Sequence, residues 1–209
     1  MTGPGAPGLI APDDLALPPD LDLGAHVTLG AGVRAGAGCS IQDGASVGAE
    51  PPGEPVVLGD GAAVCARATV AGGVEVGARA IVGDQARVEP GALLGADSVV
   101  GRNVTVGAGA RIGQRVRLQT NVRIGAGAVV GDDAFVGPAA HVGEGARLGR
   151  ACRVGAASRV GRLVTIGEEA FLAAGAEVAA EAPARAVMIG RPARHVRDVP
   201  DEDLLERPR

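Results

Sequence analysis

Aliphatic side chains recur at every sixth position over more than half of the chain. Between Leu58 and Val178 the series contains only Val, Leu and Ile at its 21 positions. The members are Leu58, Val64, Val70, Val76, Val82, Val88, Leu94, Val100, Val106, Ile112, Leu118, Ile124, Val130, Val136, Val142, Leu148, Val154, Val160, Ile166, Leu172 and Val178. A period of six is neither helical nor a simple alternation, and an unbroken short repeat is typical of a solenoid.

Each six-residue unit predicts a short strand followed by a tight turn. With the aliphatic residue as position 1, position 2 is mostly Gly and position 5 is small or β-branched. Position 4 is rich in Gly, Asn and Asp, which tolerate positive φ. Positions 1 and 5 therefore point inward, and each unit must stack on its neighbours to bury them.

The pattern closely resembles the hexapeptide-repeat proteins. The resemblance implies an all-β fold, a left-handed parallel β-helix in which three hexads form one triangular coil of 18 residues. Five glycines support this coil length, because they share position 4 and are spaced by 18: Gly73, Gly91, Gly109, Gly127 and Gly145. An earlier block keeps the period in another phase, with Leu23, Leu29, Ala35, Ile41 and Val47. About nine coils, each rising ~4.8 Å, predict a prism on the order of 40 Å long.

Three segments are expected. Residues 1–22 are predicted to form an extended N-terminal cap, and residues 23–182 the β-helix, with a register break at 48–57. Residues 183–209 are expected to be a C-terminal tail, in which residues 201–206 could form a short helix. Such tails would cover the open ends of the solenoid.

Composition and charge narrow the classes of function. A formal charge of −4 supplies no electrostatic attraction for nucleic acid or anionic membranes. No stretch of 18 apolar residues and no secretory pattern occurs, which favours the cytoplasm. Cys39 and Cys152 are predicted to be inward and reduced, as small apolar side chains.

The resemblance also implies chemistry. Hexapeptide-repeat proteins are most often acyltransferases that use coenzyme A or an acyl carrier, and they are typically homotrimers with active sites between adjacent prisms. Many use an exposed His as the general base, because its ordinary pKa lies near neutrality. His141 is the candidate here, at an outward position 6 between Arg123 and Arg159, which lie 18 residues to either side. An ordinary surface His among arginines is the alternative reading of the same positions.

Two motifs resemble acetyltransferases that modify the amino group of nucleotide-linked amino sugars. Residues 116–122 and 132–138 are similar to that group's "IQNNV … DDVFxGP" signature. Within the first motif, Gln119 and Asn121 are candidates for substrate binding together with Arg123, although position 4 also favours Asn for its backbone alone. The group's long loop after Gly-Pro is missing, because residues 139–144 continue the hexads.

Basic side chains are the candidates for coenzyme A phosphates. Residues 189–194 resemble the "GNPAR" segment that ends many members of the superfamily, which makes Arg191 and Arg194 candidates together with Arg159. Acetyl-CoA or another acyl-CoA would be a co-substrate, with no permanently bound cofactor and no metal. Seven outward arginines could bind phosphates or serve a subunit contact: Arg87, Arg111, Arg117, Arg123, Arg147, Arg153 and Arg159. Phe135, Phe171, Ile81 and Val99 share one face by the 18-residue count, which predicts a subunit interface.

The sequence is compatible with three functions. A coenzyme A-dependent acyltransferase, transferring acetyl to an amine or hydroxyl of a small molecule such as a sugar, is the main hypothesis. A non-catalytic assembly or binding solenoid is favoured by the uninterrupted repeat. A γ-class carbonic anhydrase would need three converging His, and His26, His141 and His195 lack that spacing.

Overall fold

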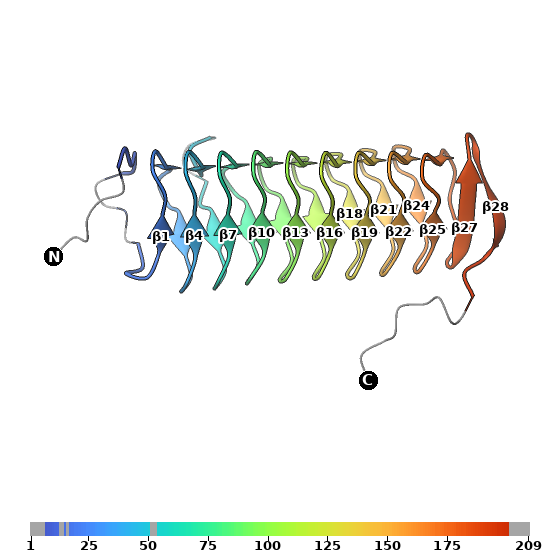
Figure 1. The fold of residues 1–209 in the computed structure, drawn as a ribbon, viewed down its shortest axis with the longest axis horizontal. Coiled ribbons are helices and arrows are strands. Elements are labelled where there is room, and N and C mark those ends of the chain that lie inside the picture. Colours follow the sequence, from blue (N-terminus) through green and yellow to red (C-terminus); the bar gives the residue numbers. More distant parts are fainter. Residues whose placement is uncertain (1–6, 13–14, 16, 51–53, 201–209) are drawn as a thin grey trace.

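The repeat folds into a long triangular β-helix (Figure 1). The computed structural model describes residues 7–12, 15, 17–50 and 54–200. Within these residues 28 strands form three sheets, and the first 26 strands are two residues long. The predicted left-handed parallel β-helix of about nine coils is confirmed.

The strands alternate among the three sheets in chain order. The eleven-stranded sheet contains β1 (Asp22–Leu23), β4 (Ser40–Ile41), β7 (Ala63–Val64), β10 (Ile81–Val82), β13 (Val99–Val100), β16 (Arg117–Leu118), β19 (Phe135–Val136), β22 (Arg153–Val154), β25 (Phe171–Leu172), β27 (Ala186–Gly190) and β28 (Ala193–Asp198). The nine-stranded sheet contains β2 (Thr28–Leu29), β5 (Ser46–Val47), β8 (Thr69–Val70), β11 (Arg87–Val88), β14 (Thr105–Val106), β17 (Arg123–Ile124), β20 (His141–Val142), β23 (Arg159–Val160) and β26 (Glu177–Val178). The eight-stranded sheet contains β3 (Arg34–Ala35), β6 (Val57–Leu58), β9 (Glu75–Val76), β12 (Leu93–Leu94), β15 (Arg111–Ile112), β18 (Val129–Val130), β21 (Arg147–Leu148) and β24 (Thr165–Ile166).

Neighbouring coils are joined by parallel pairing at a fixed offset. From β6 to β26 each residue pairs with the residue 18 positions along, as Ile81 does with Val99. The second residue of each of these strands belongs to the aliphatic series and is buried, and the small residue at position 5 is buried too. Leu118 and Val116, for example, are 1% and 0% exposed. Cys39 and Cys152 lie inside as predicted, and burial raises the pKa of Cys152 to about 12.

Every position 4 from Gly61 to Gly175 has a left-handed backbone, with φ between 53° and 72°. This includes residues that disfavour such a conformation, among them Ala139 and Leu163. The turn therefore follows from the stacking of the coils rather than from local preference alone. At each corner, an N–H donates to a carbonyl of the coil below, as Asn121 does to Arg102.

The N-terminal coils depart from strict spacing. Arg34 pairs with Val57, 23 positions away, so the coil that spans residues 48–57 carries five additional residues. Ile10 forms a parallel bridge with Thr28 and extends the stack toward the N-terminus. The boundaries of the three segments stay a prediction.

A hairpin closes the C-terminal end of the stack. β27 pairs in parallel with β25 and antiparallel with β28, and the two long strands lie across the end of the prism (Figure 1). The short helix predicted over residues 201–206 lies outside the described residues.

Candidate active site

The predicted base and two predicted arginines lie side by side on the outer face of the nine-stranded sheet. Arg123 on β17 pairs with His141 on β20, which pairs with Arg159 on β23. All three side chains are exposed, and none forms a side-chain hydrogen bond or ion pair within the part of the chain that the structure describes. We call the outer side of β14, β17, β20, β23 and β26 the histidine face.

Gln119 and Asn121 lie in the turn that leads onto the histidine face. This turn joins β16 to β17, so both residues share a coil with Arg123. Asn121 has φ 62°, and its Oδ1 accepts a hydrogen bond of 2.7 Å from Nδ2 of Asn103 on the coil before. Its side chain thus stabilises the stacking of two turns. Gln119 is half-buried, with its N–H donating to Val136 O at 2.9 Å.

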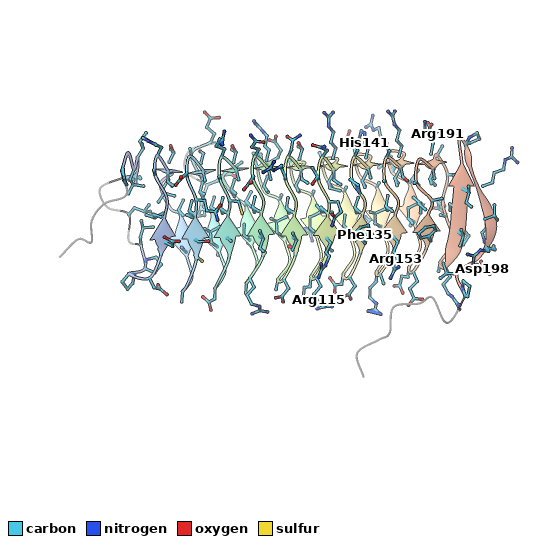
Figure 2. The ribbon with its side chains drawn as sticks, in the orientation of Figure 1. Arg115, Phe135, His141, Arg153, Arg191 and Asp198 are labelled. Atoms are coloured by element: carbon cyan, nitrogen blue, oxygen red, sulfur yellow. The ribbon has the colours of Figure 1, made fainter. Side chains whose placement is uncertain are left out.

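Arg191 and Arg194, the two candidate arginines of the tail, lie in different parts of the terminal hairpin. Arg191 lies in the turn between β27 and β28, and its Nε donates to Gly175 O at 2.6 Å. Gly175 occupies the same corner as Asn121, three coils or ~14 Å further along. His141 and Arg191 both lie along one edge of the molecule (Figure 2). Arg194 lies on β28 opposite Ile189, on the exposed hairpin.

Six of the seven predicted site residues therefore cluster along one corner and the adjoining histidine face. The seventh, Arg194, lies on the terminal hairpin. Sequence spacing was sufficient to bring Arg123, His141 and Arg159 together. The position of Arg191 depends on where the hairpin folds, and the repeat carries no signal for it.

A second cluster lies on the outer side of the eleven-stranded sheet, and the sequence predicted its shared face but not its pocket. Ile81, Val99, Phe135 and Phe171 share this side, as the 18-residue count predicts, with Arg117 and Arg153 between them. We call the outer side of β10, β13, β16, β19, β22 and β25 the phenylalanine face. Phe135, Phe171, Arg117 and Arg153 line a pocket of about 650 Å³. His141 lies on a different sheet and does not line it.

One wall of this pocket is a ladder of ion pairs along a corner of the prism. Arg79 Nε lies 2.7 Å from Asp97 Oδ1, and Arg115 binds both oxygens of Asp133 at 2.7 and 3.0 Å. The hydrogen bonds from these arginines hold the pKa values of Asp97 and Asp133 below their ordinary range. The alternating charges at 18-residue spacing are visible in the sequence and could have revealed the ladder.

The other two histidines lie elsewhere. His26 occupies an N-terminal corner with φ 56°, and His195 Nε2 lies 2.9 Å from Asp198 Oδ1 on the terminal hairpin. Within the described residues, no three His, Cys, Asp or Glu side chains gather as ligands for a metal ion. The three imidazoles thus belong to three separate parts of the molecule.

The comparisons with known proteins agree with this architecture. The family model of the GMPPB C-terminal domain matches residues 76–175. A variant of perosamine N-acetyltransferase from Caulobacter crescentus, solved with CoA and GDP-perosamine, is 29% identical with a TM-score of 0.53. The match covers 54% of this chain and 54% of that protein, so the chain spans about half the length of this relative.

Two further structures share the fold at lower identity. LpxA from Acinetobacter baumannii is 14% identical, with a TM-score of 0.59 over 90% of this chain and 72% of that protein. UDP-N-acetylglucosamine acyltransferase from Campylobacter jejuni is 17% identical, with a TM-score of 0.54 over 92% and 73%. The chain shares the β-helix fold of these proteins, and its predicted resemblance to the hexapeptide-repeat acyltransferases is confirmed. No curated protein sequence matches the chain.

The described part of the chain contains no helix of the length and apolar character needed to cross a membrane.

Proposed function

We propose that the protein is a coenzyme A-dependent acyltransferase that moves an acetyl group from acetyl-CoA to an amine or hydroxyl, with sugars as the acceptor class to test first. The observation that carries this proposal is His141, an exposed imidazole between two arginines that have no ionic partner within the described residues. The perosamine N-acetyltransferase, whose structure holds CoA and GDP-perosamine, supports the same class of reaction.

The proposed reaction is a direct transfer. The acceptor nitrogen or oxygen attacks the thioester carbonyl, and His141 removes its proton as the new bond forms. The carbon–sulfur bond then breaks, and the thiolate of coenzyme A leaves and takes up a proton. One acyl group is transferred, one proton moves from acceptor to thiol, and no electrons are exchanged.

The oxyanion that forms on the carbonyl needs hydrogen-bond donors beside His141. We assign this role to the Gln119 side chain and to the N–H of Thr120, which makes no backbone hydrogen bond within the described residues. Both groups belong to the turn that leads onto the histidine face. Ala139, two residues before His141, donates its N–H to Thr120 O, so this turn lies one coil below the base.

The remaining predicted residues receive binding roles. Arg123 and Asn121 would contact the acceptor, while Arg159, Arg191 and Arg194 would contact the phosphates of the acyl donor. Guanidinium groups suit phosphates because they donate two parallel hydrogen bonds. Arg191 has a fixed position for this role because Gly175 holds its Nε.

The test is acetyl transfer from labelled acetyl-CoA to a panel of amino sugars, with a His141→Gln variant. We expect turnover to fall by a factor of about 100 or more in this variant. His195→Gln is the matched control, because it removes an imidazole from the hairpin and should leave turnover unchanged. Equal turnover in wild type and His141→Gln would show that His141 is not the general base.

A non-catalytic assembly or binding solenoid is the second candidate. The observation in its favour is the unbroken series of strands from β6 to β26, with no inserted loop to shape a pocket. Acyl-CoA binding separates the two functions. A ligand present at 100 times its Kd adds about 2.7 kcal/mol to the free energy of unfolding, and an assembly protein should show no such shift.

We also propose a homotrimer in which Ile81 and Val99, two coils or more before Phe135 on the phenylalanine face, take part in the contact between subunits. Ile81 is 38% exposed, and aligned apolar side chains of this kind favour association. Light scattering coupled to gel filtration measures the mass directly. The cytoplasmic location stays a prediction.

A further inference from the structure

The outward arginines of the two coils around His141 are arranged in two rings. Arg111, Arg117 and Arg123 follow one another on the three faces of the prism, and Arg147, Arg153 and Arg159 do so two coils later. None of the six has an ion-pair partner in the described part of the chain. Each face therefore presents two unneutralised guanidinium groups about 10 Å apart.

The phenylalanine face differs from the other two because its pair of arginines lies beside two aromatic rings. The strands place Arg117, Phe135, Arg153 and Phe171 in consecutive coils, in this order. Phe135 and Phe171 are 37% and 39% exposed, so parts of both rings can be reached by a ligand. Phe135 and Arg153 lie on the side of the prism that faces the viewer in Figure 2.

The carboxylates in the pocket do not neutralise these two arginines. Asp97 is paired with Arg79, and Asp133 is paired with Arg115 and lies 3.5 Å from Arg150. Arg117 and Arg153 thus keep their charge for an anion from outside. The volume of about 650 Å³ lies within the usual range for a small-molecule site.

We propose that the pocket on the phenylalanine face binds a nucleoside phosphate, at a site distinct from the histidine face. The flat base stacks on Phe135 or Phe171, since aromatic rings bind nucleobases without base-specific contacts. The phosphates bind Arg153 and Arg117 through charge-assisted hydrogen bonds. A nucleoside phosphate unites both features, because its base and its anion are separated by only one ribose.

Isothermal titration calorimetry at low salt tests the proposal on the full-length protein. ADP is the primary probe. Adenosine tests the base and ribose without phosphates, and pyrophosphate tests the anion without the nucleoside. We expect ADP to bind at least tenfold more tightly than either part. Substitution Arg153→Gln should weaken ADP binding by at least tenfold, and Phe135→Leu should weaken ADP and adenosine but not pyrophosphate.

Arg147→Gln is the matched control, because Arg147 has the same strand position, exposure and lack of an ionic partner on the eight-stranded sheet. This variant should bind ADP as the wild type does. Thermal melting of each variant verifies that the fold is retained. Absence of ADP binding to the wild type, or equal weakening by Arg147→Gln and Arg153→Gln, would overturn the proposal.

Two sources of the nucleotide are separated by further titrations. CoA carries the nucleotide of the acyl donor, whereas UDP-N-acetylglucosamine carries that of a sugar acceptor. If Arg153→Gln weakens the binding of CoA or of UDP-N-acetylglucosamine, that ligand supplies the nucleotide. If the substitution weakens the binding of ADP alone, the pocket binds a free nucleotide. These titrations need no turnover, so loss of the proposed acyl transfer in the His141 variant leaves their outcome unaffected.

Discussion

Two serine hydroxyls inside the prism occupy equivalent positions but differ in their hydrogen bonds. Ser98 and Ser158 both stand at position 5 and are 0% exposed. Ser158 Oγ donates to Ala173 O at 2.9 Å, whereas Ser98 Oγ has no partner among the described residues. A buried hydroxyl without a partner costs free energy, because it has lost its hydrogen bonds to water.

Replacement of the two serines by alanine should therefore change the free energy of unfolding in opposite directions. We expect Ser98→Ala to raise the free energy of unfolding by about 1 kcal/mol, and Ser158→Ala to lower it by about 1 kcal/mol. Alanine fits the first site, since Ala62 and Ala80 occupy the same position in the preceding coils. Urea unfolding followed by circular dichroism measures both. A destabilised Ser98→Ala would mean that its hydroxyl has a partner after all.

At the scale of the element, the strand and turn unit uses glycine for two different reasons. A Cβ on Gly107 would lie 2.5 Å from Ala126 N in the next coil, so this position requires close backbone approach. Gly109, two residues later, has φ 64° and nothing within 4 Å of such a Cβ. The first glycine is needed for packing between coils and the second only for backbone conformation.

Alanine at these two glycines should separate the two requirements. We expect Gly107→Ala to cost about 3 kcal/mol or more, because a backbone clash must be relieved by moving one coil. Gly109→Ala should cost about 1 kcal/mol, the usual penalty for a left-handed non-glycine residue. Denaturant unfolding of both variants gives the comparison, and equal losses would contradict the distinction.

Also at the scale of the element, the ladder of ion pairs along the corner makes the free energy of unfolding depend on pH. Asp133 has a pKa below its ordinary value, mainly because of its hydrogen bond from Arg115. Its stabilising contribution is present above the pKa of the unfolded chain, ~3.9, and is lost as the pH falls through the lower folded value. The effect is modest, on the order of a few tenths of a kcal/mol, because half of the Arg115 side chain is exposed and solvent weakens the ion pair.

The pH dependence of unfolding should therefore be smaller in Asp133→Asn. We expect this variant to be less stable than wild type at pH 7 and to approach it below pH ~3. Asp22→Asn, which changes an exposed carboxylate outside the ladder, is the matched control. Urea midpoints measured between pH 2 and 7 provide the test. A constant difference between wild type and Asp133→Asn across this range would contradict the assignment.

At the scale of the whole molecule, the terminal hairpin protects the end of the solenoid. A β-helix has unpaired N–H and C=O groups on its last coil, and these can pair with another chain. β27 pairs with β25 and thus covers the end of the eleven-stranded sheet. Met188 and Ala186 of this strand are buried against the core.

Removal of the hairpin should expose the unpaired backbone N–H and C=O groups of the last coil. We expect a chain truncated after Ala182 to form larger assemblies, because its last coil can pair with another copy. Dynamic light scattering over a concentration series, with the full-length chain beside it, measures the change. A truncated chain that keeps the mass of the full-length protein at all concentrations would show that the hairpin has no such role.

The local sequence was sufficient to predict the coil. Its six-residue period determines which side chains point inward, because a two-residue strand followed by a turn of fixed length repeats the same geometry. The 18-residue count then places Arg123, His141 and Arg159 in adjacent coils, and Phe135 beside Arg117 and Arg153.

The tertiary structure alone determined the features that depart from the period. Ala139 and Leu163 adopt a left-handed backbone because the stacked coils impose the turn on residues that would avoid it. Arg191 reaches Gly175 only because the hairpin returns across the last coil. The pocket forms where a corner ladder meets two phenylalanines from different coils. A repeat specifies what each unit buries, whereas contacts among distant units depend on how the stacked coils and the final hairpin are placed in space.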